Sequence, residues 1–235
     1  MTLIVGLGNP GKEYENTRHN VGWQVLDALA KTREGSWKTD KKIQALIYHP
    51  EPNHRHPEPD EGSRGVTMTL LKPLTYMNNS GLAVAAFLKH RYFSTRSTRS
   101  KNNSYASSRV EKFPLIVLHD DIDLPLGTVR VSFGSSSGGH NGVQSIIDHL
   151  KTKDFWRIRI GVAPKTGSPD ASVGASSSDR SVGGTWKQKT DPSAFVLKPF
   201  TKAENSQLKK ILPRILSLLQ ETIETPRVQT MRQDQ

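Results

Sequence analysis

The feature that most constrains the fold of this chain is the alternation of two kinds of apolar segment. Runs in which apolar residues alternate or are continuous predict strands, and they occur at 2–7, 44–49, 66–71, 114–120, 128–133 and 156–163. Apolar residues at helical spacing occur at 20–33, 80–93, 141–150 and 201–224. Because strands and helices interleave, the sequence indicates the α/β class, and its 235 residues are enough for a single domain of that kind.

The last predicted helix carries two further local signals. Thr201 and Glu204 stand at the spacing of a capping box, in which each residue satisfies a backbone N–H of the other at a helix N-terminus. Pro213 lies inside the same segment and lacks the N–H that a helix interior uses. We therefore expect the helix to begin near Thr201 and to be kinked or interrupted at Pro213.

Three segments lack the apolar residues needed to fold on their own, and they lie at 49–65, 94–109 and 166–190. We expect one domain over residues 1–235, with these segments as flexible surface insertions. The first insertion contains histidines that could ligate a metal ion, but a solvated polar loop is the favoured interpretation: His49, His54 and His56. The second contains basic residues and no acidic residue: Arg96, Arg99, Lys101 and Arg109.

The composition narrows the class of protein. The chain has 33 Lys and Arg against 22 Asp and Glu, a formal charge of +11 and a pI near 9.9, which favours a polyanionic partner such as nucleic acid over a generally basic protein. The absence of cysteine excludes disulfides and thiolate metal sites. No apolar run reaches the length of a membrane span, and the strand-like LIVGL follows Met1 within a residue, so we expect a soluble, cytoplasmic protein without a cleaved leader, an organelle being the alternative.

The glycines Gly6, Gly8 and Gly11 follow the first predicted strand with the spacing GxGxxG. A dinucleotide-binding turn would need a helix starting at these glycines and an acidic residue about 20 positions later. The polar KEYENTRH follows instead, and the position 20 beyond Gly11 is Lys31 within a helical segment. A dinucleotide-dependent oxidoreductase is therefore disfavoured, and we expect the glycines to turn the chain sharply beneath a bound ligand.

Three more polar clusters follow predicted strands. They are the acidic Asp120, Asp121 and Asp123, the segment TYMNNSG at 75–81, and the loop GSSSGGHNG at 134–142, whose backbone N–H groups we expect to offer an anion site at the start of a helix. Each cluster taken alone is better explained by turns and helix caps. Together they predict a ligand site, because the sites of open α/β sheets gather at the carboxyl ends of the strands.

Four segments together resemble the bacterial-type peptidyl-tRNA hydrolases in order and spacing: VGLGNPGKEYENTRHNVG, YMNNSG, HDDIDLPLG and GGHNG. The likeness runs from residue 2 to about 163 and continues through DPSAFVLKPFTKAE into the last helix. It implies a single α/β domain with a mixed, mostly parallel sheet flanked by helices. It also implies hydrolysis of the ester that joins a peptide to the 3′ end of tRNA, without a metal or cofactor.

The resemblance also assigns roles to residues. The catalytic histidine of the family falls on His19, its supporting carboxylate on Asp120, and the asparagine that distinguishes peptidyl from aminoacyl substrates on Asn9. Positions that contact the substrate fall on Tyr14, Tyr76, Asn78 and Asn141. Basic positions that face phosphate fall on Arg130 and Arg159. His119 and His140 neighbour these residues and are left unassigned.

These residue types suit ester hydrolysis. A neutral imidazole can take a proton from attacking water, and a carboxylate bonded to its other nitrogen fixes the tautomer and stabilises the imidazolium that forms. No cysteine is present to act as a thiol nucleophile, and direct attack by water is favoured over an acyl-enzyme.

The basic surplus then predicts a tRNA partner that is bound without sequence specificity. Separately, we expect the protein to be a monomer. Whether the 94–109 segment contacts that tRNA or is a solvated linker stays open. A non-catalytic RNA-binding protein on the same fold is the alternative function.

Overall fold

The computed structural model describes residues 2–50, 68–93, 114–164 and 191–224. A single seven-stranded sheet runs through the middle of these residues, in the order β2-β3-β4-β1-β5-β7-β6. The strands are β1 (Thr2–Gly6), β2 (Gly35–Asp40), β3 (Ala45–Pro50), β4 (Met68–Pro73), β5 (Leu115–Pro125), β6 (Val129–Phe133) and β7 (Trp156–Ala163). The four strands in the middle of the order, β4, β1, β5 and β7, are mutually parallel, and the other pairings are antiparallel. The single α/β domain and its mixed sheet are thereby confirmed.

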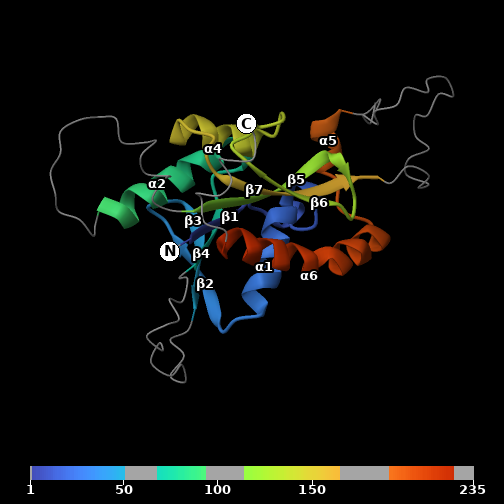
Figure 1. The fold of residues 1–235 in the computed structure, drawn as a ribbon, viewed down its shortest axis with the longest axis horizontal. Helices are drawn as coiled ribbons and strands as arrows, with labels where there is room; N and C mark the ends of the chain where they lie inside the picture. The colour runs from blue at the N-terminus through green and yellow to red at the C-terminus, as the bar shows by residue number, and fades with distance from the viewer. Residues whose placement is uncertain (1, 51–67, 94–113, 165–190, 225–235) are drawn as a thin grey trace.

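Helices cover both faces of the sheet (Figure 1). They are α1 (Val21–Lys31), α2 (Ser80–Phe93), α4 (Asn141–Leu150), α5 (Pro192–Val196) and α6 (Lys202–Glu224), with short 3₁₀ turns η1 (Lys12–Tyr14), η2 (Arg18–Asn20) and η3 (Met77–Asn79). Within the described residues, no helix combines the length and apolarity needed to cross a bilayer. The result is a three-layer arrangement with α1 and α6 on one face and α2 and α4 on the other.

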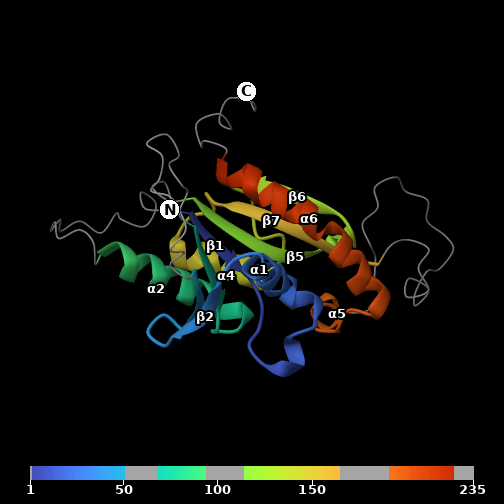
Figure 2. The ribbon, with the colours of Figure 1, turned by 90° about the horizontal axis from the view of Figure 1, so that it is seen from below.

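The alternation of side chains along β1 explains the two cores. Ile4 packs among residues of α1 and α6, whereas Leu3 and Val5 pack among residues of α2 and α4. Figure 2 shows α6 crossing the β7 side of the sheet, which it contacts. Because successive side chains of a strand point to opposite faces, each central strand contributes to both cores.

The structure departs from the sequence-based prediction at several elements. β2 and α5 were not predicted, because an edge strand with the sequence GSWKTD shows little apolar alternation and α5 has only five residues. β5 does not end at Asp120 but continues to Pro125, since its backbone keeps pairing with β7 after an irregularity between Asp121 and Pro125. His49 belongs to β3, so the first expected insertion starts later than predicted. The remainder of that segment, with His54 and His56, and the segments at 94–109 and 166–190 lie outside the described residues.

Of the two local signals in the last helix, the structure follows the capping box and not the proline. The capping box is confirmed: the Thr201 N–H donates to Glu204 Oε2 at 2.7 Å, and the Glu204 N–H donates to Thr201 Oγ1 at 3.2 Å. The expected interruption at Pro213 is wrong, because α6 continues through it to Glu224. Leu208, Ile215 and Leu219 are buried against the sheet on both sides of the proline, and this packing outweighs the missing hydrogen bond.

Replacing Pro213 by alanine should raise the free energy of unfolding by about 2 kcal/mol. The side chain is exposed, so little packing is lost. Helix propensity favours alanine over proline by about 3 kcal/mol. About 1 kcal/mol of this gain is offset, because the unfolded chain without the proline has more conformational entropy. Urea denaturation measures the change, with the exposed Lys210→Ala as the control for alanine in the same helix. A Pro213→Ala protein no more stable than this control would contradict the prediction.

Candidate active site

A cavity of about 730 Å³ lies at the carboxyl ends of the central parallel strands. Its wall includes the loops after β1 and β4, parts of β5 and β7, the loop before α4, and part of α5. Seven of the nine residues singled out from the sequence line it: Asn9, His19, Tyr76, Asn78, Asp120, Asn141 and Arg159. The topology thus brings together side chains that are far apart along the chain.

Two of the predicted residues, both within the described part of the chain, lie outside this cavity. Tyr14 is half-buried in η1, and its backbone carbonyl accepts hydrogen bonds from the N–H and the hydroxyl of Thr17. Arg130 is exposed on the edge strand β6, directly opposite Arg159 on β7. Tyr14 therefore supports the turn before His19, and Arg130 lies beside the cavity next to one of its lining residues.

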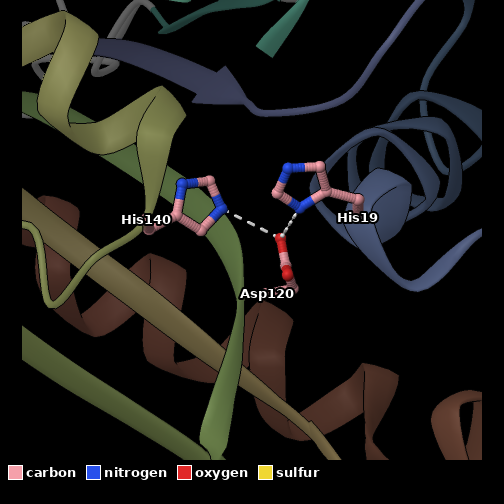
Figure 3. A group of neighbouring side chains, drawn as sticks. All are labelled: His19, Asp120 and His140. Carbon is pink, nitrogen blue, oxygen red and sulfur yellow. Dashed lines mark hydrogen bonds and ion pairs between the residues drawn. The ribbon is translucent and has the colours of Figure 1, made fainter. Parts of the chain in front are cut away.

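The centre of the site is a hydrogen bond between the η2 turn and strand β5 (Figure 3). His19, in the η2 turn before α1, and Asp120, on β5, are joined by a bond of 2.9 Å between Nδ1 and Oδ1. Asp120 is 3% exposed, so its carboxylate has almost no contact with solvent. An ionised carboxylate only accepts hydrogen bonds, so Nδ1 of His19 carries the proton of this bond, and in the neutral ring Nε2 is the nitrogen that can accept a proton.

A second histidine, His140, approaches the same oxygen from the other side, with its Nε2 at 2.9 Å from Asp120 Oδ1 (Figure 3). Its Nδ1 accepts the backbone N–H groups of Gly142 and Val143, as the N-cap of α4. A nitrogen that accepts two N–H groups carries no proton. The ring is therefore the tautomer with hydrogen on Nε2, and it donates to Asp120.

The sequence left His140 unassigned, although its place directly before a predicted helix was a usable signal for a cap. The cap also changes the expectation for the Gly/Ser loop. The N–H groups of Gly142 and Val143 bond to His140, so these two are not free for the anion that the loop composition suggested.

The two histidines decide the ionisation of Asp120. Burial alone would raise the pKa of this carboxyl, but the favourable charge interactions and hydrogen bonds with His19 and His140 outweigh burial and hold its pKa far below the usual range. The carboxylate is thus ionised at neutral pH. It can fix the tautomer of His19 and stabilise a positive charge on that ring.

His19, Asp120 and His140 also form the one group of three candidate metal ligands found among the described residues, with ligand atoms within 4.8 Å of one another. Both ring nitrogens point at the same carboxylate oxygen, and each is hydrogen-bonded to it. The arrangement is therefore a hydrogen-bonded cluster centred on Asp120, and its donor set of two imidazoles and one carboxylate is one that transition metals accept.

His119 lies directly beneath this cluster. Its Nδ1 donates to the backbone carbonyl of Asp120 at 2.7 Å, and its ring meets His140 edge-on with centroids 4.7 Å apart. Burial, with a smaller contribution from the neighbouring His140, lowers the pKa of His119 well below its usual 6.5. His119 is therefore a neutral, buried residue at the wall of the cavity, a role that the sequence alone did not reveal.

This depressed pKa predicts a loss of stability in acid. Below about pH 6.5 the unfolded chain binds a proton at His119 that the folded protein does not, so the free energy of unfolding should fall with pH by up to about 1.4 kcal/mol per pH unit. In His119→Phe the slope of the free energy of unfolding against pH, between pH 7 and 5, should be smaller by the equivalent of up to one bound proton. Urea denaturation at several pH values measures the slope, and equal slopes for the two proteins would contradict the prediction.

Asn9 is held by a residue that the sequence analysis missed. Asn20 is buried, and its side chain makes two bonds to the backbone of Asn9, one with the N–H and one with the carbonyl, both at 2.9 Å. Asn20 precedes α1 and looks like a helix cap in the sequence, yet its side chain caps nothing there. The side-chain Oδ1 of Asn9 in turn accepts the N–H of Met77 at 2.7 Å. Asn9 Oδ1 therefore already accepts one hydrogen bond, whereas the N–H groups of its Nδ2 have no bond to the described residues and can donate into the cavity.

Arg159 is oriented by a neighbouring acid. Its Nε donates to Asp121 Oδ2 at 2.5 Å, and the other oxygen of Asp121 accepts the Asp123 N–H at 2.9 Å. The side chain of Arg159 is 31% exposed. The bond to Asp121 uses only Nε, which leaves the terminal N–H groups facing the cavity and the solvent.

The glycines of the GxGxxG segment allow close packing between the end of β1 and α1. A Cβ on Gly6 would lie 2.5 Å from the carbonyl oxygen of Gly22 in α1, and one on Gly8 would lie 2.7 Å from the ring of Trp23. Of these three glycines, Gly11 alone has a positive φ, 121°. Because α1 begins only at Val21, no α-helix N-terminus faces the turn, and the geometry of a dinucleotide site is absent from this described region.

Comparison with known proteins agrees with this geometry. Residues 3–176 match the family model described as peptidyl-tRNA hydrolase. A peptidyl-tRNA hydrolase of Geobacillus kaustophilus is 37% identical over 232 residues, which cover 98% of this chain and 97% of that protein. The chain belongs to the peptidyl-tRNA hydrolase family. The resemblance noted in the sequence is thus confirmed.

Two more members of this family illustrate the extent of the match. The peptidyl-tRNA hydrolase of a Sulfurihydrogenibium species is 36% identical, over 94% of this chain and 92% of its own length. The crystal structure of peptidyl-tRNA hydrolase from Acinetobacter baumannii superposes with a TM-score of 0.61 at 26% identity, over 95% of this chain and 92% of that one. The likeness therefore covers nearly the whole fold.

Proposed function

We propose that this member of the family hydrolyses the ester between a peptide and the 3′ end of tRNA, with His19 as the general base. The observation that carries the proposal is the bond between His19 Nδ1 and the buried carboxylate of Asp120, because it leaves His19 Nε2 unprotonated in a residue that lines the cavity. A protein that only bound RNA would have no need of an oriented imidazole. Turnover of peptidyl-tRNA by the purified chain distinguishes the two functions.

The reaction follows from this arrangement. Nε2 of His19 removes a proton from water as the water oxygen attacks the ester carbonyl, and Asp120 stabilises the imidazolium that results. The C–O bond to the ribose then breaks, and the imidazolium returns its proton to the leaving 3′ oxygen. The products are a peptide carboxylate and free tRNA.

The asparagines are proposed to bind the peptide. Asn78 and Asn141 are exposed at the cavity and can both donate and accept hydrogen bonds, which suits the developing oxyanion and the peptide backbone. Asn9 is disposed to donate from its Nδ2, because its oxygen is already bonded to the Met77 N–H. Such donors suit the acyl carbonyl of a peptidyl group but cannot bond to the ammonium of a free aminoacyl group. This polarity supports the role of Asn9 in substrate choice.

Arg159 and Arg130 are proposed to contact phosphate. They lie opposite each other on β7 and β6, and Asp121 orients Arg159 without occupying its terminal N–H groups. With a formal charge of +11, the protein should bind tRNA without sequence specificity and with a strong dependence on salt. We propose that it acts as a monomer in the compartment in which translation occurs.

His19→Ala should lower kcat by about a thousandfold or more while leaving the Kd for tRNA nearly unchanged, because the base acts in the transition state. Release of peptide from N-acetyl-aminoacyl-tRNA measures kcat, and filter binding measures Kd. His49→Ala is the matched control, since His49 lies on β3 in the hairpin with β2, outside the cavity. A His19→Ala protein within tenfold of wild type would exclude His19 as the base.

Asn9→Asp should shift substrate choice toward free aminoacyl-tRNA. Aspartate can still accept the Met77 N–H, but it replaces the N–H donors by a carboxylate oxygen that attracts an ammonium group. The ratio of kcat/KM for blocked and unblocked substrate should fall by about tenfold or more. Asn79→Asp places the same charge on an exposed residue nearby and should leave the ratio unchanged. Equal ratios for Asn9→Asp and wild type would contradict the proposal.

A further inference from the structure

Arg18 precedes the proposed catalytic base and is buried, with only 5% of its side chain exposed. Its guanidinium spans two parts of the C-terminal region. Nη1 donates to the carbonyls of Lys198 at 3.1 Å and Pro199 at 2.9 Å, and Nη2 donates to Glu204 Oε1 at 2.6 Å. The segment after α5 and the first turn of α6 are therefore bonded directly to the residue beside His19.

Backbone pairing reinforces this connection. The Arg18 N–H donates to the Lys198 carbonyl at 3.2 Å, and the Phe200 N–H donates to the Asn16 carbonyl at 2.9 Å. Thr17 and Pro199 form an isolated antiparallel bridge between them. The η2 turn is thus held along one side by the chain that enters α6.

Two aromatic rings cover the guanidinium. Its carbon lies 4.4 Å from the centroid of the Phe195 ring and 5.4 Å from that of Phe200. The rings favour the cation and keep water away from it. A buried guanidinium of this kind depends on its anionic partner, because removing one member of a buried ion pair leaves an uncompensated charge.

Glu204 uses its two carboxylate oxygens for different purposes. Oε1 accepts from Arg18, and Oε2 accepts the Thr201 N–H of the capping box. The residue therefore both begins α6 and compensates the charge of Arg18. Only 10% of its side chain is exposed, and it does not line the cavity among the described residues.

We infer that Arg18 and Glu204 are positioning residues that hold His19 at its bonding distance from Asp120. The inference rests on the proposed role of His19 as the base. Arg18 and His19 share a peptide bond within η2, so a displacement of the Arg18 side chain is transmitted to the His19 backbone. A displacement of about 1 Å at a reacting group can lower a rate by about a hundredfold.

The same connection joins the base to the part of the cavity wall that follows Phe195. Val196 and Leu197 line the cavity, and they lie between Phe195 and the carbonyls that Arg18 binds. The ion pair thus fixes the C-terminal wall and the catalytic turn relative to each other. Glu204, in the last helix, can therefore affect the position of His19, which lies near the other end of the chain.

The test separates the two uses of Glu204. Glu204→Gln keeps a side-chain oxygen for the capping box but removes the charge that pairs with Arg18. Thr201→Ala does the reverse, since it removes the hydroxyl of the box and leaves the ion pair intact. Glu221→Gln is the control for an exposed Glu–Arg pair on the same helix.

In Glu204→Gln, kcat for N-acetyl-aminoacyl-tRNA should fall by about tenfold or more, with KM within about twofold of wild type. The ring N–H signal of His19 Nδ1, observed by proton–nitrogen NMR, should broaden or shift as its bond to Asp120 loosens. Thr201→Ala should lose stability but keep both kcat and this signal. Glu221→Gln should match wild type in all measurements.

A Glu204→Gln protein that is destabilised as much as Thr201→Ala, with the same kcat and the same His19 signal as wild type, would overturn the inference. If Glu204→Gln does not fold, Arg18→Lys provides the second test, because lysine keeps the charge but cannot reach three acceptors from one planar group. It should show the same fall in kcat, and an unchanged kcat would overturn the inference. Failure of the proposed function is distinguishable, because it would show as absent turnover in wild type or as full activity in His19→Ala.

Discussion

The buried carboxylate of Asp120 is the group on which the arrangement of the site depends. A charge this deep is stable only because two imidazoles donate to it, and each imidazole is fixed elsewhere in the fold. His140 is locked by the N-terminal N–H groups of α4, while His19 lies in a turn anchored by its neighbours. The ionised carboxylate of one side chain therefore joins a central strand, a helix cap and a turn.

The turn itself is fixed from two directions. Asn20 ties it to the loop after β1, and Arg18 ties it to the chain entering α6. Close packing beneath makes this possible, because a Cβ on Gly22 would lie 2.4 Å from the carbonyl oxygen of Leu118. The absent side chain lets α1 approach β5 closely enough for His19 to reach Asp120.

Much of the fold could be predicted because its central elements carry strong apolar patterns. α2, α4 and β7 have the predicted bounds, and the remaining long elements differ only at their ends, apart from β5. β2 was missed because an edge strand depends on pairing with β3 more than on its own composition. Pro213 was judged by local propensity, but the packing of the buried face of α6 decided the outcome.

The sequence by itself determined the class of fold, the family, and the residue types that gather after the strands, because these depend on periodicity and on local spacing. Only the tertiary structure decided how those residues are used. It showed that His140 donates to Asp120, that the side-chain oxygen of Asn9 accepts the Met77 N–H, and that Glu204 pairs with Arg18. Each of these facts is a hydrogen bond between residues distant in the chain, and a one-dimensional pattern does not encode which lone pair or N–H remains free once the backbone has closed around it.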